Sequence, residues 1–230
     1  MSAEQLKQRD AMQRLTDFLN EVGMLRHTPR SGYKFLGSGR ETVAEHSHRT
    51  AVIGYALAQK TGADAARTVM LCLFHDLPEA RTGDFNYVNR LYDTSRERDA
   101  LEDAVEGTGL EEDIMSIWDE HAGRTTPESL LAHDADQLDL ILNLKRESDL
   151  GNRYADKWLE SAVERLRTDI AKELERSYNV KIHIANDSLK TFRFYGNFVR
   201  REQNIQEVLE ALASTEKMQY KIEERNITIY

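Results

Sequence analysis

Cysteine, proline and long apolar segments are scarce in this chain of 230 residues. The single cysteine, Cys72, cannot form an internal disulfide, so stability must come from a hydrophobic core, which a chain of this length can build. The longest apolar run, Val69–Phe74, is too short to cross a bilayer, and we expect no membrane partner. The first residues lack the basic and apolar segments of a secretory signal, which favours a cytoplasmic protein.

Basic residues are outnumbered, because 31 lysines and arginines face 40 acidic residues, for a formal net charge of −9. A surface of this sign repels phosphate backbones, so we exclude a nucleic-acid polymer as partner. A small phosphorylated ligand needs only a few local basic groups and is compatible with this composition. With 40% hydrophobic residues, the chain is also too apolar to be mostly disordered.

Few glycines and prolines, together with many good helix formers, predict a predominantly α-helical chain. The segment 65–77 is apolar nearly all round, a pattern typical of a buried helix. Helices are expected, from the spacing of apolar residues, over 4–24, 43–61, 65–76, 96–106, 111–121, 125–150, 154–177 and 202–212.

Two of these helix starts carry a capping sequence. Thr42 precedes Glu45 by three residues, and Thr125 precedes Glu128 by the same interval. In a capping box, the hydroxyl oxygen and the carboxylate each accept from a backbone N–H that the helix itself leaves unpaired. We therefore expect helices to begin directly after Thr42 and after Thr125.

Two histidines fall where a buried polar site could be built. On the helix that begins at Val43, His46 lies on the apolar stripe that faces the core. His75 and Asp76 end the apolar run of the next helix. Burying an imidazole beside a carboxylate is costly unless both are satisfied, and a metal ion satisfies both at once. Taken singly, a hydrogen-bonded core histidine and an ordinary ion pair are the simpler interpretations.

Three segments together are more informative than any one residue. They are VAEHSHR at 43–49, HDLPEA at 75–80 followed by TGD at 82–84, and ADQL at 135–138. This ordered H…HD…D set resembles the HD-domain metal-dependent phosphohydrolases, and its surroundings are most similar to the 5′-deoxynucleotidase branch of that superfamily. The resemblance covers about residues 5–150.

The resemblance implies an all-α fold, with an HD-domain helical bundle over residues 1–178. Residues 179–230 would form a mostly helical C-terminal extension that packs on the domain or at a dimer interface. Alternating apolar residues near 180–184 and 227–229 leave two short strands open in this extension. Relatives often form dimers, so the resemblance also implies a homodimer.

Roles are implied residue by residue. Glu79 matches the glutamate that handles the attacking water or the leaving group, and Asp84 matches the second acidic residue that acts with it. Arg30 and Tyr33 resemble an arginine-plus-aromatic element near the sugar and phosphate, where relatives tend to carry tryptophan. Arg40, from the same basic loop, is a further candidate for substrate binding, although the loop could simply be solvated. The implied metal ligands are His46, His75, Asp76 and Asp136.

Two alternatives stay open at the metal site. Asp134 competes with Asp136 for the place of the last ligand, and the match to relatives favours Asp136. His121 and His133 could hold a second metal or support the first from outside, and the one-ion relatives of this branch favour a supporting role.

Two imidazoles and two carboxylates suit one divalent transition metal, namely Mn²⁺, Co²⁺, Fe²⁺, Ni²⁺ or Zn²⁺, better than Ca²⁺. The expected function is removal of phosphate from (deoxy)nucleoside 5′-monophosphates by a metal-bound hydroxide. Two alternatives are hydrolysis of another phosphorylated nucleotide, and a non-catalytic helical module that keeps a metal for stability and binds a ligand.

Overall fold

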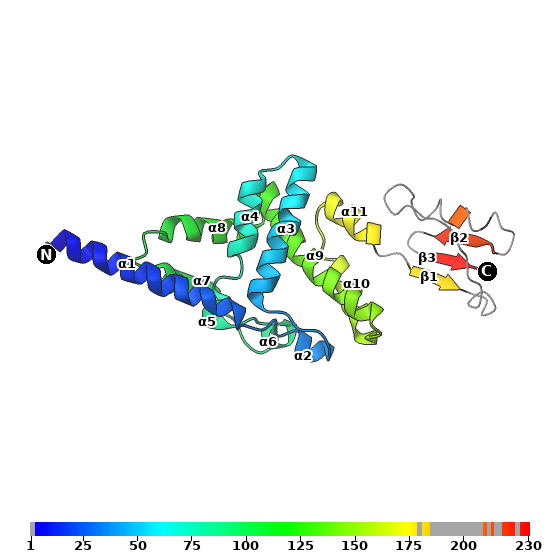
Figure 1. The fold of residues 1–230 in the computed structure, drawn as a ribbon, viewed down its shortest axis with the longest axis horizontal. Helices are drawn as coiled ribbons and strands as arrows, with labels where there is room; N and C mark the ends of the chain where they lie inside the picture. The colour runs from blue at the N-terminus through cyan, green and yellow to red at the C-terminus, as the bar shows by residue number, and fades with distance from the viewer. Residues whose placement is uncertain (1–2, 179–180, 185–208, 211–212, 214–217, 224–225) are drawn as a thin grey trace. The chain divides into compact units, whose positions relative to one another are not determined.

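The computed structural model describes residues 3–178, 181–184, 209–210, 213, 218–223 and 226–230 (Figure 1). The chain forms two compact units, Met1–Glu175 and Arg176–Tyr230.

The first unit is helical throughout, as the all-α prediction requires, with one 3₁₀ turn at Gly23–Arg26. Three of its helices, α2, α5 and α6, were not predicted, because a single turn is too short to show a periodic pattern. The helices are α1 (Ala3–Val22), α2 (Tyr33–Leu36), α3 (Val43–Thr61), α4 (Ala65–Phe74), α5 (Glu79–Thr82), α6 (Tyr87–Arg90), α7 (Glu97–Val105), α8 (Glu111–Gly123), α9 (Pro127–Asp149), α10 (Arg153–Val163) and α11 (Asp169–Tyr178).

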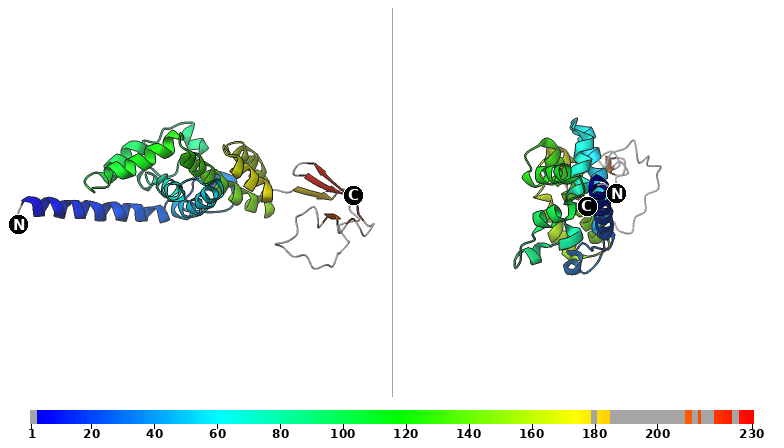
Figure 2. Two further views of the ribbon diagram at one scale, coloured as in Figure 1. Left: turned by 90° about the horizontal axis from the view of Figure 1, so that it is seen from above. Right: turned by 90° about the vertical axis from the view of Figure 1, so that its left-hand side faces the viewer.

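Helices α3, α4 and α9 pack against one another at the centre of this unit (Figures 1 and 2). Leu71 and Leu138 are fully buried at these contacts. The contact between α3 and α4 is close at Gly54, where a Cβ atom would lie 2.6 Å from the Cys72 sulfur. Helix α10 packs on α9, while α1 contacts α5 and α7. This arrangement brings the start of α3, the end of α4 and the middle of α9 together.

The start of α3 follows the sequence prediction. Thr42 accepts from the Glu45 main-chain N–H at 3.2 Å, and the Glu45 carboxylate accepts from the Thr42 main-chain N–H at 2.8 Å. The helix ends at Gly62, whose φ of +76° is readily adopted by glycine. The capping box at Thr42 therefore places His46 in the first turn of the helix.

Two local predictions were wrong. Helix α9 is capped by Thr126 with Ser129, one residue later than expected, because the Glu128 carboxylate instead accepts from the Asp64 main-chain N–H at 3.0 Å. Helix α4 is not buried all round, since Met70 and Leu73 are 37% and 38% exposed. Its buried face consists of Thr68, Leu71 and Cys72.

The single helix expected over 154–177 is divided into α10 and α11. The carboxylate of Asp134, fully buried on α9, accepts from the main-chain N–H of Arg167 at 2.9 Å and of Thr168 at 2.6 Å. It also accepts from the Thr168 hydroxyl at 2.7 Å and lies 3.1 Å from His133 Nδ1. Asp134 therefore holds the connection between the two helices against α9.

The second unit contains three strands, β1 (Lys181–Ile184), β2 (Tyr220–Glu223) and β3 (Asn226–Ile229). They form a sheet of order β1-β3-β2, in which β1 is parallel and β2 antiparallel to β3. The two possible strands of the sequence prediction are present, and β2 is additional. The expected helix over 202–212 lies largely outside the described residues. Most of the described residues of this extension are in strands, whereas a mostly helical extension was expected.

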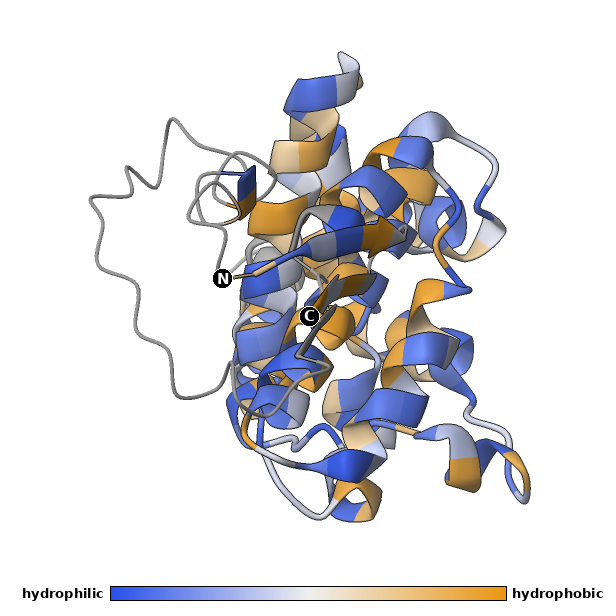
Figure 3. Ribbon diagram, turned by 90° about the vertical axis from the view of Figure 1, so that its right-hand side faces the viewer, coloured by the Kyte–Doolittle hydropathy of each residue, from blue (hydrophilic) through white to orange (hydrophobic). Residues whose placement is uncertain are grey.

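Hydrophobic and hydrophilic residues alternate around the helices in the way that amphipathic packing requires (Figure 3). Among the residues that the structure describes, no helix is both long and apolar enough to cross a membrane.

Replacing Asp134 by asparagine should destabilise the protein. The carboxylate accepts hydrogen bonds from main-chain N–H groups, and the amide nitrogen of asparagine cannot accept them. We expect a loss of about 2–3 kcal/mol in the free energy of unfolding, which corresponds to a fall of roughly 5–10 °C in Tm for a chain of this size. Asp169→Asn, at an exposed position in the first turn of α11, is the control and should change stability by less than about 0.5 kcal/mol. Equal Tm values for the two variants, measured by circular dichroism, would contradict this account.

Candidate metal centre and adjoining pocket

Four of the expected side chains lie together at the junction of α3, α4 and α9. His46 Nε2 lies 3.2 Å from Asp136 Oδ1 and 3.6 Å from Asp76 Oδ2. His75 Nε2 lies 3.1 Å from the same Asp76 oxygen. One ligand atom from each of His46, His75 and Asp136 lies within 4.8 Å of the other two.

Both imidazoles direct Nε2 into this junction. His46 Nδ1 donates to Asp139 Oδ2 at 2.8 Å, and His75 Nδ1 donates to the Cys72 main-chain oxygen at 2.7 Å. A carbonyl oxygen only accepts, so His75 Nδ1 carries a proton, and Nε2 is the ring atom that a ligand at the junction can reach. Both Nε2 atoms are buried, and although carboxylate oxygens are near, neither nitrogen makes a hydrogen bond.

This donor set fits a divalent cation. A buried nitrogen without a partner is unfavourable, and metal coordination through Nε2 removes that cost while the second ring nitrogen keeps its outer partner. Asp76 and Asp136 supply anionic oxygen on the facing side. An N and O set of this kind suits divalent transition metals.

The charges of the cluster are strongly coupled. Burial and the Arg30 charge lower the pKa of His46, but the carboxylates of Asp136 and Asp139 outweigh them and raise it to about 10. Burial opposes ionisation of Asp136, yet His46, His75 and Arg30 hold its pKa well below the usual range. The carboxylates are therefore anionic at neutral pH, as metal ligands must be, whereas His46 is protonated, so an ion bound through its Nε2 would displace that proton.

Arg30 lies beside the cluster, with its side chain 17% exposed. Its Nη1 donates to Asp76 Oδ2 at 3.2 Å and lies 3.9 Å from Asp84 Oδ1, while Nη2 lies 3.9 Å from Asp136 Oδ1. Asp84 Oδ2 accepts from the main-chain N–H of Ser31 at 2.5 Å and from its hydroxyl at 2.9 Å. Asp84 thus fastens the loop that carries Arg30 next to the candidate ligands.

Glu79, the first residue of α5, is 5% exposed, and its Oε2 has no hydrogen-bond partner. Burial, together with the negative charges of Asp76 and Asp84, raises the pKa of Glu79 to about 10. A carboxyl group that stays neutral at pH 7 can donate a proton to a reacting oxygen.

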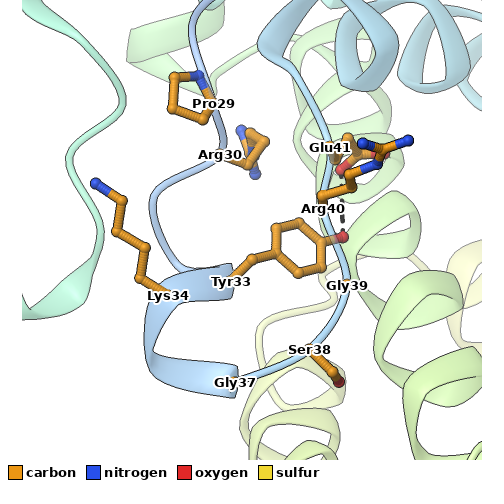
Figure 4. Close-up of a pocket in the computed structure, with 9 residues that line it drawn as sticks. All are labelled: Pro29, Arg30, Tyr33, Lys34, Gly37, Ser38, Gly39, Arg40 and Glu41. Atoms are coloured by element: carbon orange, nitrogen blue, oxygen red, sulfur yellow. Dashed lines mark hydrogen bonds between the residues drawn. The ribbon is translucent and has the colours of Figure 1, made fainter.

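A pocket of about 370 Å³ adjoins the cluster through Arg30 (Figure 4). The Tyr33 ring extends across it, and its hydroxyl donates to Glu41 Oε2 at 3.4 Å. Gly39 has a φ of +79°, and a Cβ atom there would lie 2.8 Å from the Tyr33 ring, so the ring needs glycine at this point. The lining residues are Pro29, Arg30, Tyr33, Lys34, Gly37, Ser38, Gly39, Arg40 and Glu41.

The three residues expected to bind substrate therefore occupy different positions. Arg30 is shared by the pocket and the metal cluster, and Tyr33 lies within the pocket. Arg40 is exposed and lines the pocket.

His121 and His133 do not join the cluster. The His121 ring lies 5.1 Å from the His75 ring, and burial followed by the His75 charge lowers the pKa of His121 to about 4. His133 lies beside Asp134, on the side of α9 that holds the α10–α11 connection. Within the described ranges, neither belongs to a group of three potential ligands.

Sequence reasoning missed Asp139, Arg49 and Glu41, which surround His46. Asp139 is one helical turn after Asp136, a spacing that places the two carboxylates on neighbouring parts of one face. That spacing was the available signal. No comparable spacing indicated Arg49 or Glu41. Arg49 contacts Asp139, which is 90 residues away, and Glu41, which precedes the start of α3.

Glu79→Gln should stabilise the metal-free protein at alkaline pH. Because the pKa of Glu79 is about 10 in the folded protein and 4.5 for an ordinary glutamate of the unfolded chain, the folded chain binds more protons between these values, and stability falls as pH rises through that window. Glutamine is neutral throughout, so at pH 8 the variant should be more stable by at least about 1 kcal/mol, the equivalent of less than one pKa unit. The measurement is urea unfolding with EDTA at pH 5 and pH 8.

Glu128→Gln is the matched control, since it replaces a carboxylate that accepts a main-chain N–H away from the cluster. It should show no alkaline gain. An identical pH dependence in wild type and Glu79→Gln would contradict the burial of a neutral carboxyl group.

Comparison with known proteins identifies the family. A family model described as HD domain matches residues 22–177, and one described as FecR, C-terminal, matches 167–229. The chain is 27% identical to 5′-deoxynucleotidase HDDC2 of Danio rerio over 145 residues (60% of this chain, 72% of that protein). It is 25% identical to HDDC2 of Homo sapiens over 182 residues (72% and 88%).

Among solved structures, a conserved hypothetical protein from Pyrococcus furiosus matches with a TM-score of 0.59 and 25% identity, over 69% of this chain and 94% of that one. The HD-domain match spans more than half of the chain, including all four candidate ligands. The chain therefore belongs to the HD-domain family, in agreement with the resemblance of its H…HD…D segments.

Proposed function

We propose that this protein is a metal-dependent phosphatase that removes phosphate from (deoxy)nucleoside 5′-monophosphates. The observation that carries the proposal is the pair of buried, unpartnered Nε2 atoms of His46 and His75, which face two carboxylates beside Arg30. The HD-domain family and relatives named 5′-deoxynucleotidases support the reaction class.

His46, His75, Asp76 and Asp136 would hold one divalent transition metal, Mn²⁺, Co²⁺, Fe²⁺, Ni²⁺ or Zn²⁺. Two nitrogens and two carboxylates leave coordination positions for other ligands. When bound, such an ion lowers the pKa of water and polarises a phosphoryl oxygen.

The remaining groups have complementary tasks around the phosphate. The Arg30 guanidinium, which lies within 3.9 Å of three carboxylates, would bind the phosphate oxygens and offset their charge. Glu79 would give its proton to the leaving alcohol oxygen, since its carboxyl group is neutral and buried. Asp84 would act through Ser31, by keeping the Arg30 loop in place.

The pocket next to Arg30 would take the nucleoside. Its volume of about 370 Å³ falls within the range of small-molecule sites. Tyr33 offers an aromatic face, and Arg40 and Lys34 add positive charge at its edge. The cytoplasmic location and the homodimer stay predictions.

Phosphate release from a panel of nucleoside 5′-monophosphates, with Mn²⁺ or Co²⁺ added, tests the proposal. Wild type should release phosphate only with metal, and Glu79→Gln should lower kcat by about 10²–10⁴-fold because the proton donor is lost. Asp76→Asn should abolish metal stimulation, since it removes an anionic ligand that faces both histidines.

Glu128→Gln again serves as the control and should retain wild-type kcat and KM. Metal-stimulated release from nucleoside triphosphates but not monophosphates would redirect the proposal to another phosphorylated nucleotide. Absence of release from every phosphate ester would leave the non-catalytic ligand-binding module as the remaining function.

A further inference from the structure

His46 depends on a partner that is itself buried. The imidazole and the Asp139 side chain are both 0% exposed, and His46 Nδ1 donates to Asp139 Oδ2 at 2.8 Å. A buried carboxylate is costly unless it is paired and hydrogen-bonded. The pairing of Asp139 therefore decides whether the His46 ring keeps its orientation.

Arg49 supplies that pairing, one turn after His46 on α3. Its Nε donates to Asp139 Oδ1, the oxygen that His46 does not use. Its Nη2 donates to the Asp139 main-chain oxygen at 3.2 Å. The two carboxylate oxygens thus have separate partners, and a rotation of the Asp139 side chain would break both contacts.

Arg49 is held in turn by Glu41, one of the residues that line the pocket. Arg49 Nη2 donates to Glu41 Oε1 at 3.2 Å, and Asn143 Nδ2 donates to both Glu41 oxygens at 3.0 Å. The Tyr33 hydroxyl completes the set at 3.4 Å from Glu41 Oε2. Hydrogen bonds therefore run without interruption from the pocket to the Nδ1 side of His46.

Glu41, His46 and Asp139 are also close enough together to resemble a second metal group. The available atoms argue against a cation there. Both oxygens of Glu41 and both of Asp139 already accept hydrogen bonds, and His46 offers its protonated nitrogen. A cation at this point would also lie against the Arg49 guanidinium.

His75 is oriented differently. Its Nδ1 donates to the main-chain oxygen of Cys72, which the end of α4 fixes without any charged partner. Of the two histidines, His46 alone relies on side chains from another helix for its orientation. A change in Asp139 or Arg49 should therefore act on one candidate ligand and leave the other unchanged.

We propose that Asp139 and Arg49 are positioning residues of the metal centre, which keep His46 Nε2 directed at the ion, with Glu41 holding Arg49 from the pocket side. This inference rests on the proposed metal-binding function, and it concerns residues that touch neither the ion nor the substrate. Outer partners of metal-bound histidines typically contribute about 10–100-fold to metal affinity.

Titration of the EDTA-treated full-length protein with Co²⁺ tests the proposal, with visible absorption as the readout. Asp139→Asn and Arg49→Gln should each bind Co²⁺ about 10–100-fold more weakly than wild type and show an altered visible spectrum. Arg49 is 38% exposed, so Arg49→Gln remains informative if Asp139→Asn does not fold.

Arg67→Gln is the matched control. Arg67 is 34% exposed and pairs with Glu120, so its loss removes a comparable ion pair that does not include Asp139. Its Co²⁺ affinity should equal that of wild type. An equal loss in Arg67→Gln would indicate general destabilisation and overturn the positioning role, as would wild-type affinity in Arg49→Gln.

The two proposals fail in distinguishable ways. If wild type binds Co²⁺ and the Asp139 and Arg49 variants bind it equally well, the positioning role alone is refuted. If wild type itself binds no divalent ion, the metal-dependent function fails and the positioning role fails with it.

Discussion

The site depends on the cost of leaving two imidazole nitrogens buried without a hydrogen-bond partner. His46 and His75 each use one ring nitrogen for a strong contact behind the site, so the other cannot turn away to find a partner. Carboxylates face these nitrogens, and their charge must be offset because the Asp76 and Asp136 side chains are only 15% and 22% exposed. An ion that accepts nitrogen lone pairs and carries positive charge satisfies both requirements.

Ordinary helix signals create this arrangement. The Thr42–Glu45 capping box places His46 in the first turn of α3, and the Asp64 cap places His75 directly after α4. Asp134 and Asp136, two residues apart on α9, serve opposite faces, so one holds the α10–α11 connection while the other faces the histidines. Helix ends and faces therefore position the four candidate ligands, while a loop supplies Arg30.

Much of this was predictable from local patterns, because the helical class, the start of α3 and the inward position of His46 depend only on short-range spacing. The division of α10 from α11 was not predictable, since its cause is a carboxylate 33 residues earlier in the chain. The same holds for Arg49 and Asp139, which are 90 residues apart. Contacts of that separation appear only when helices pack, and no periodicity in a single sequence reports them.

The close approach of α3 to α4 at Gly54 has a consequence for the distance between the two imidazoles. Each of these helices carries one of the two imidazoles, and the Cys72 residue that touches Gly54 through its sulfur also holds His75 through its main-chain oxygen. A methyl group at residue 54 would force the helices apart and lengthen the span between the ring nitrogens. The residue with the smallest side chain in this core thus helps to keep the two histidines at their present separation.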